Sequence, residues 1–245
     1  MMPWPEAIAA YLRAETAAGR PATTRKLRGE QLTRFSREVG CPLGELTGDR
    51  IEDWFSRQNA WALETRRSNR GALLSLLRWA YKAGVIAEPL DEALPVVKPG
   101  KAAPRPAPDD VWSAALMRAD DRTRLMLRLA AEAGLRRAEV AKVHRRDLLP
   151  GPSLLVHGKG AKDRVVPISD DLAHAISQAD GWLFPGRTGH MAPRSVGNLV
   201  TDVLPDGWTM HTLRHRFATR AFRGSRNLRA VQVILGHSSV ATTER

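Results

Sequence analysis

A few short segments in the second half of the chain carry residues that could act together on an anion. In AGLRRAEV, Arg136 follows Gly134 and Leu135, and Glu139 comes three residues later. Residues three apart on a helix are neighbours, so the pair alone is typical of a surface ion pair. Arginine is also the side chain that binds phosphate oxygens through two parallel hydrogen bonds. Both readings of the segment stay open on these residues alone.

A lysine between two glycines marks the next segment, HGKGAKDR, where Lys159 would lie at the tip of a hairpin. The segment does not fit the phosphate-binding pattern GxxxxGK[ST], so it does not indicate a nucleotide-binding loop. Lys159 is therefore either a solvated turn lysine or a lysine on a mobile arm that reaches a phosphate.

Two later segments carry histidines next to basic or helix-ending residues. In HTLRHRFATR, His211 and Arg214 are three residues apart and would project from one helix face, so both could reach one anion. The alternative is a basic helix lying on DNA. In LGHSSVATTER, His237 follows Gly236, where the helix dipole favours a capping histidine.

Metal chemistry is not indicated by these segments. A metallonuclease needs clustered carboxylates for divalent ions, and none of the four segments carries two acidic residues. The seven histidines show no zinc-ligand spacing, and Cys41 is the one cysteine. We expect neither a metal nor another cofactor.

The charge of the chain points to a polyanionic partner. The 245 residues carry a net charge of +12. The first 95 residues hold 14 basic and 12 acidic side chains, which leaves 24 basic and 14 acidic in the rest. Such an excess favours nucleic acid, although an arginine-rich protein from a GC-rich genome would also show it.

Nothing in the sequence predicts a membrane or exported protein. No apolar run approaches the roughly 20 residues that span a bilayer. The first residues lack a basic stretch before an apolar core, as an export signal would have. A single cysteine cannot form an internal disulfide, which suits a reducing cytosol.

Apolar spacing predicts mostly helices, with a proline-rich break at residues 95–108. Thr23 or Thr24 should cap the second helix and Gly84 should end the fourth, whose inward face would include Tyr81. Two β-prone runs, 154–156 and 165–168, predict a hairpin. The fold class is therefore mainly α with a small β-hairpin or sheet in the second domain (α+β). The expected helices cover about 4–18, 23–39, 48–58, 64–83, 108–118, 121–133, 136–147, 170–178, 193–203, 211–223 and 226–235.

The order and spacing of the four segments resemble the tyrosine recombinase family. GLRxxE is followed 23 residues on by GKGxKxR, 52 further by HxLRH, and LGH ends 23 beyond Arg214. The family includes phage integrases and the recombinases that resolve chromosome dimers. The resemblance implies a two-domain clamp on DNA, with a helical core-binding domain at 1–94, a linker at 95–107 and a catalytic domain at 108–245.

The resemblance implies strand cleavage and rejoining through a 3′-phosphotyrosine intermediate. Arg136 and Arg214 match the arginines that clamp the phosphate oxygens, and Glu139 matches an acidic position that orients the site. Without a metal, such cations must balance the charge of the transition state. Lys159 matches the general acid for the leaving 5′-oxygen. His211 matches the histidine that accepts the tyrosine proton or hydrogen-bonds the phosphate, and His237 matches a hydrogen-bond donor to it.

The nucleophile itself is expected at position 246, one residue past Arg245, because the family's tyrosine follows the LGH histidine by nine residues. Tyr11 and Tyr81 are the two tyrosines present, and both have the spacing of core residues. We therefore expect a truncated recombinase that binds its core site without cleaving it. The alternative is a non-catalytic DNA-binding protein or regulator derived from a recombinase. The chain also leaves no room for the arm-binding domain found before the helical domain in many phage integrases.

The implied partners are double-stranded DNA core sites and further copies of the chain, as a dimer or tetramer on DNA in the bacterial cytoplasm. No membrane partner and no small-molecule substrate are expected. Basic residues outside the catalytic set should contact DNA: Arg66, Arg67, Arg70, Lys162, Arg164 and Arg216.

Overall fold

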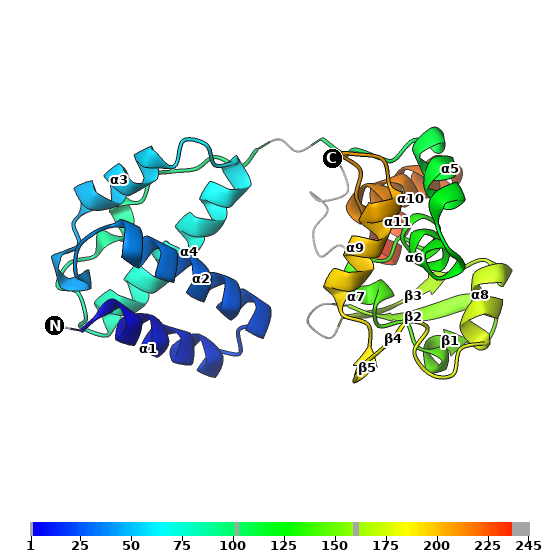
Figure 1. Ribbon diagram of the computed structural model, residues 1–245, viewed down its shortest axis with the longest axis horizontal. Helices are drawn as coiled ribbons and strands as arrows, with labels where there is room; N and C mark the ends of the chain where they lie inside the picture. Colours follow the sequence, from blue (N-terminus) through cyan, green and yellow to red (C-terminus); the bar gives the residue numbers. More distant parts are fainter. Residues whose placement is uncertain (1, 101–102, 159–161, 237–245) are drawn as a thin grey trace. The chain divides into compact units, whose positions relative to one another are not determined.

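The computed structural model describes residues 2–100, 103–158 and 162–236, which form two compact units, Met1–Lys101 and Ala102–Arg245 (Figure 1). Each unit has its own apolar core. Among the described residues, no helix combines the length and apolar character needed to cross a bilayer.

The first unit consists of four helices and two short 3-10 turns around an aromatic core. Trp54 lies at its centre and makes edge-to-face contacts with Phe35, Phe55 and Trp61. These contacts bury the apolar faces of helices whose other faces are charged. The elements are α1 (Trp4–Ala17), α2 (Ala22–Glu38), η1 (Leu43–Glu45), α3 (Gly48–Arg57), α4 (Leu63–Lys82) and η2 (Leu90–Ala93).

Two expectations for this unit are wrong. Tyr81 is 47% exposed near the end of α4, so it is not a core residue, whereas Tyr11 is buried as expected. The helix α2 begins at Ala22, and its N-cap residue is Pro21, which has no side-chain group to cap it. Thr23 and Thr24 cannot be the N-cap because both lie inside the first turn of the helix. Gly84 does adopt the left-handed conformation, with φ of 67°, just after α4.

The second unit surrounds a small antiparallel sheet with helices (Figure 1). Alternate residues of the hairpin face the core, with Leu154 and Val156 on β2 and Val166 on β3 buried. The helices are α5 (Asp109–Arg118), α6 (Asp121–Ala131), α7 (Arg137–Val140), α8 (Asp170–Ser177), α9 (Pro193–Val203), α10 (Met210–Ser225) and α11 (Leu228–Leu235). The remaining elements are η3 (Arg145–Asp147), β1 (Leu148–Leu149), β2 (Ser153–His157), β3 (Asp163–Pro167), β4 (Pro185–Gly186) and β5 (Gly189–His190).

The predicted fold class, mainly helical with a small hairpin or sheet, is confirmed. The sheet is larger than expected because β1 pairs with β2, and β4 and β5 form a second ribbon. The helix expected over 136–147 is two shorter turns, α7 and η3. Strands of two residues are too short to show any alternation in the sequence.

The segment before α5 is fixed to the second unit. The amide of Ala107 donates to the Thr212 carbonyl at 3.1 Å, and the Arg216 guanidinium donates to the Ala107 carbonyl at 3.0 Å. The Arg105 guanidinium lies 4.1 Å from the centre of the Trp208 ring, and the Arg105 amide donates to Nδ1 of His215. The end of the predicted linker is therefore held against α10.

Candidate active site

The helix α7 begins with Arg136 as its N-cap residue, and Glu139 lies in its first turn. The Glu139 carboxylate accepts the Arg136 amide at 2.7 Å and the Arg136 guanidinium at 2.9 Å. A carboxylate is favoured there by the exposed amides and the positive end of the helix dipole. Glu139 is buried, whereas the Arg136 side chain remains 41% exposed. Arg136 can therefore still reach an anion from solvent.

Arg214, from the second turn of α10, is buried and lies beside the same carboxylate. Its guanidinium donates to the carbonyls of Gly134 and Leu235, and lies 3.7 Å from Glu139. Burial first, and then the charge of Arg136, lowers the pKa of Arg214 to about 9. The group therefore stays protonated at neutral pH.

The loop before α7 requires a glycine at position 134. Gly134 has a φ of 65°, and a Cβ atom there would lie 2.4 Å from the Phe217 ring. A larger residue would be strained in this conformation and would also displace the ring. The close contact brings the Gly134 carbonyl to Arg214 and places Arg136 two residues further on.

His211 lies one helical turn before Arg214, and its ring makes a tilted contact with His215 at 4.3 Å between centroids. Burial, the neighbouring His215 and the charges of Arg214 and Arg136 lower the pKa of His211. A neutral imidazole can accept a proton, which is what the role of a general base requires. His211 and Arg214 lie one turn apart on the same helix, α10.

Arg164 is a member of this cluster that the sequence analysis assigned to DNA binding. It lies on β3, is buried, and donates to both oxygens of Glu139 at 2.9 and 2.8 Å. Because strand residues alternate in direction, Arg164 shares the inward face with Val166, and that alternation is the signal that could have identified it. We correct the expectation: Arg164 faces the protein interior rather than DNA.

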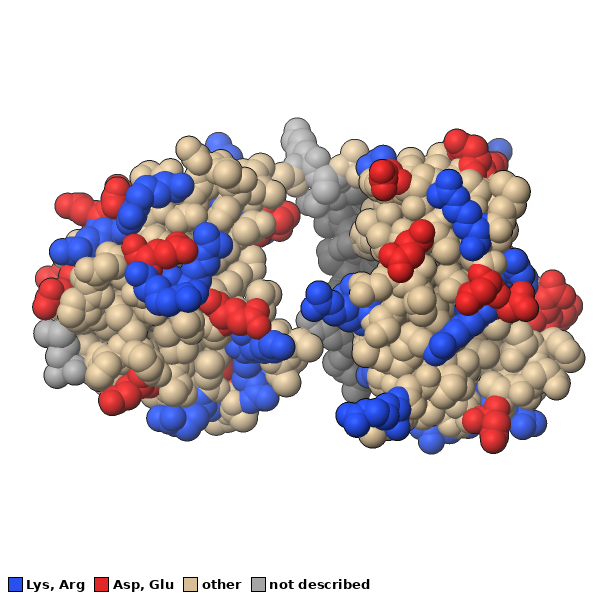
Figure 2. All heavy atoms as spheres, in the orientation of Figure 1, with Lys and Arg blue, Asp and Glu red and all other residues tan. Residues whose placement is uncertain are grey.

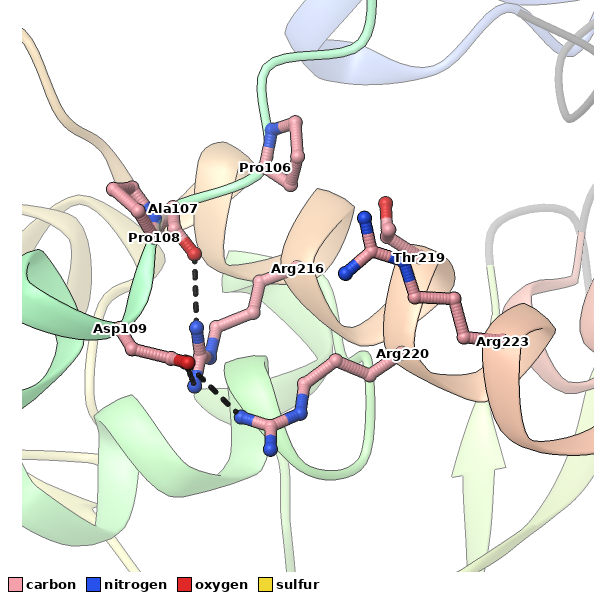
Figure 3. A pocket seen from close by; sticks show the side chains of 8 residues that line it. All are labelled: Pro106, Ala107, Pro108, Asp109, Arg216, Thr219, Arg220 and Arg223. Atoms are coloured by element: carbon pink, nitrogen blue, oxygen red, sulfur yellow. Dashed lines mark hydrogen bonds and ion pairs between the residues drawn. The ribbon is translucent and has the colours of Figure 1, made fainter.

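Arg216 also differs from its expectation as a DNA-binding residue. It is buried, donates to the Ala107 carbonyl and forms an ion pair with Asp109. Figure 3 shows it in a surface pocket of about 490 Å³, between the segment before α5 and one side of α10. Residues two apart on a helix point to different sides, so Arg216 faces away from Arg214. Its side chain instead contacts Ala107 and Asp109 of the second unit.

The other predicted basic residues differ in their solvent exposure and in the contacts that their side chains make within the protein. Arg67 is exposed and pairs with Glu64 on the same helix, and Lys162, directly before β3, is exposed. Arg66 and Arg70 donate to backbone carbonyls of their own unit and are half-buried. On the face shown in Figure 2, basic side chains are scattered among acidic ones on both units.

The structure thus brings together three of the six predicted catalytic residues, Arg136, Glu139 and Arg214, and places a fourth, His211, one turn before Arg214 on α10. The other two, Lys159 and His237, lie outside the described residues. Gly236, the last described residue, accepts a hydrogen bond from Arg136 at 3.3 Å. In the described parts of the chain, no group of three acidic, histidine or cysteine side chains could hold a metal ion.

Comparison with known proteins places this chain in the phage integrase family. Residues 113–245 match the model of the phage integrase family. The tyrosine recombinase XerD of Caulobacter vibrioides is 28% identical, over 98% of this chain and 90% of its own length. The tyrosine recombinase XerC of Rhodospirillum centenum is 34% identical, over 83% of this chain and 68% of its own length.

A solved structure shares the fold over the whole chain. It is that of a lambda integrase dimer bound to a COC′ core site, with a TM-score of 0.80 at 17% identity. The match covers 100% of this chain and 77% of the integrase chain.

Proposed function

Because this chain belongs to the phage integrase family of tyrosine recombinases, we propose that it is a site-specific DNA recombinase whose second unit holds the scissile phosphate. The observation that carries the proposal is the pairing of a buried arginine with a half-exposed one around a single carboxylate. Arg214 supplies a fixed cation, Arg136 supplies one that reaches solvent, and Glu139 fixes both. Two guanidinium groups can bind the non-bridging oxygens of one phosphate.

The chemistry is phosphoryl transfer to a tyrosine. The phenol oxygen forms a bond to phosphorus, and the bond between phosphorus and the 5′-oxygen breaks. His211, held neutral by its surroundings, accepts the phenol proton or hydrogen-bonds the phosphate. Lys159 gives a proton to the leaving 5′-oxygen, and His237 donates a hydrogen bond to the phosphate. The charge that develops on the phosphate oxygens faces Arg136 and Arg214.

A second candidate function is DNA binding without cleavage, as a regulator would need. The observation that favours it is that both tyrosines of the 245 residues lie in the first unit. Tyr11 is buried and accepts a hydrogen bond from Arg28, and Tyr81 lies on α4 of the first unit. Neither belongs to the unit that holds the arginine cluster. A second unit without a tyrosine of its own would bind the site and leave it intact.

The partners follow from the same proposal. The chain binds duplex core sites through phosphate contacts that include Arg67 and Lys162, with Arg66 and Arg70 in weaker roles because carbonyls already hold them. Copies of the chain associate as a dimer or tetramer on the DNA, with the first unit as the core-binding domain and the second as the catalytic domain. The reaction takes place in the bacterial cytoplasm.

The test begins with a duplex selected for binding from a randomised library with the 245-residue chain. A nicked form of that duplex, which traps a cleaved strand, is then incubated with three proteins. These are the chain itself and two chains extended past Arg245 that differ only in tyrosine or phenylalanine at position 246. A denaturant-resistant protein–DNA band is expected with the tyrosine version alone.

Three results would contradict the proposal. Failure of selection to enrich any sequence would remove site-specific binding. A covalent band from the 245-residue chain would assign the nucleophile to another residue. Binding without a band from any of the three proteins would support the regulator instead.

A further inference from the structure

Three arginines donate to three successive carbonyls at the C-terminal end of α11. Arg164 Nε donates to the Ile234 carbonyl at 2.6 Å. Arg214 donates to the carbonyl of Leu235, and Arg136 to that of Gly236 at 3.3 Å. The last carbonyls of a helix lack partners within the helix and carry its negative partial charge, so cations are favoured there. The three side chains reach this end from three different elements, β3, α10 and the start of α7.

The same three arginines meet at Glu139. Its Oε1 accepts from Arg136 and Arg164, both at 2.9 Å, and its Oε2 accepts from Arg164 at 2.8 Å and from the Arg136 amide at 2.7 Å. Arg214 approaches Oε2 to 3.7 Å. The carboxylate and the helix end therefore form two anchor points that all three guanidinium groups share.

Arg164 differs from the other two in how its guanidinium is used. All three of its nitrogens donate within the protein, and its side chain is 6% exposed. Arg136 is the exposed member, and Arg214 is directed at two carbonyls beside it. Arg164 also packs at Gly236, where a Cβ atom would lie 3.1 Å from its Cδ. It therefore contacts both Glu139 and the end of α11, and its guanidinium is directed at the protein interior rather than at solvent.

We propose that Arg164 is a positioning residue, whose planar guanidinium sets Glu139 and the end of α11 so that Arg136 and Arg214 hold the phosphate. The inference rests on the proposed function for its last step. A lysine in its place would keep the charge but offer one compact head, which cannot bind both carboxylate oxygens and the Ile234 carbonyl in one plane. The helix end and Glu139 would then shift relative to each other. A displacement of about 1 Å in such a site can cost about 10²-fold in rate.

The main experiment compares Arg164→Lys with Arg124→Lys. Arg124 pairs with Asp121 on the surface of α6 at 2.6 Å, so the control breaks an arginine–carboxylate pair of the same unit away from the cluster. Both are made in the 245-residue chain and in the version that carries a tyrosine at position 246. Melting temperature, affinity for the selected duplex, cleavage rate on its nicked form and the NMR signals of arginine Nε–H groups are measured.

For Arg164→Lys we expect duplex affinity within about threefold of the unchanged chain and cleavage reduced by about 10²-fold. The Nε–H signals of Arg136 and Arg214 should shift or broaden, and Arg124→Lys should change none of these. Equal losses of binding and cleavage, or unchanged signals of both arginines in a folded protein, would overturn the proposal. If the tyrosine version of the unchanged chain does not cleave, the proposed function fails while the NMR result still decides the role of Arg164.

A second variant covers the case in which Arg164→Lys unfolds. Glu139→Gln combined with Arg164→Gln removes this buried ion pair as a unit, so that Arg214 alone keeps a buried charge beside it, held by the carbonyls of Gly134 and Leu235. This protein should fold, bind the duplex and still show altered Arg136 and Arg214 signals with cleavage lost. Normal signals and normal cleavage in it would refute a positioning role.

Discussion

Replacing Glu139 with glutamine is expected to destabilise the second unit strongly while sparing DNA binding. The carboxylate accepts four hydrogen bonds within 2.9 Å, and it is the acidic group shared by three arginines. Glutamine keeps one carbonyl oxygen and places an NH2 group against the N–H donors of Arg164. Breaking a buried ion pair by removing one partner costs about 3–5 kcal/mol, because the other charge stays buried. We expect a loss of that size in the free energy of unfolding.

The pH dependence of the same variant gives an independent check. Although burial opposes it, the hydrogen bonds and charges of Arg164 and Arg136 give a net lowering of the pKa of Glu139 below its ordinary value. A carboxyl whose pKa is lower in the folded state contributes stability that is fully present above the unfolded pKa of about 4.3. That contribution is lost as the pH falls through the lower folded pKa. In Glu139→Gln this part of the acid sensitivity should disappear, while carboxyls elsewhere keep theirs.

The assay is urea unfolding of the whole chain at several pH values between 3 and 8. It is followed by circular dichroism and by hydrogen exchange of the β2–β3 amides, which report the second unit. Affinity for the selected duplex is measured in parallel and should not fall, because the change removes a negative charge beside the phosphate site. A loss of stability below 1 kcal/mol, or an acid profile identical to that of the unchanged chain, would refute the central role given to the carboxylate.

Three further outcomes are expected. Arg214→Ala in the tyrosine version should reduce the cleavage rate roughly 10²–10³-fold, because the lost donor faces concentrated charge only in the transition state. Duplex affinity measured by gel shift should fall only a few-fold, and equal losses in both assays would make Arg214 a binding residue. Gly134→Ala should lose about 2 kcal/mol or more by urea unfolding, because of its φ of 65° and the Phe217 ring; a neutral effect would contradict that geometry. Affinity for the duplex should fall with salt with a log–log slope of roughly −0.9 per phosphate contacted, and a slope near zero in an anisotropy titration would exclude phosphate contacts.

The helices could be predicted from the sequence because their signals are local. Apolar spacing predicts the bounds of α1, α3, α5 and α9 to within about a residue, since an amphipathic helix must place its apolar residues on one face. The start of α2 was missed at Thr23 because the preceding proline ends the turn earlier. The strands β4 and β5 are stabilised by their surroundings and leave no pattern in two residues each.

The candidate site shows a different limit of sequence reasoning. Residue type and spacing point to Arg136, His211 and Arg214 as candidate site residues. The sequence alone, however, does not distinguish an arginine that binds DNA from an arginine that binds a buried glutamate. Arg164 and Arg216 were both assigned to DNA, and both lie inside the second unit. Two kinds of information distinguish a buried arginine from one that binds DNA. One is the direction in which the side chain points from β3 or α10, and the other is the residue that it meets there. The partner of Arg164 is Glu139, which lies 25 positions away in the sequence, and the tertiary fold brings the two side chains together.

The balance of charge in the cluster explains how its parts can serve both the folded state and the reaction. Among the described residues, Arg136, Arg164 and Arg214 share one carboxylate, so two positive charges are left over. In the protein alone, that excess is offset by the carbonyl end of α11, which supplies only partial negative charge. On the proposed function, a phosphate that enters beside Arg136 would replace a weak partner with a full charge, and the added charge of the transition state would strengthen the same contacts further. On this proposal, Glu139 and Arg164 keep the other two arginines assembled before DNA arrives, so that little rearrangement is needed when the strand is cleaved.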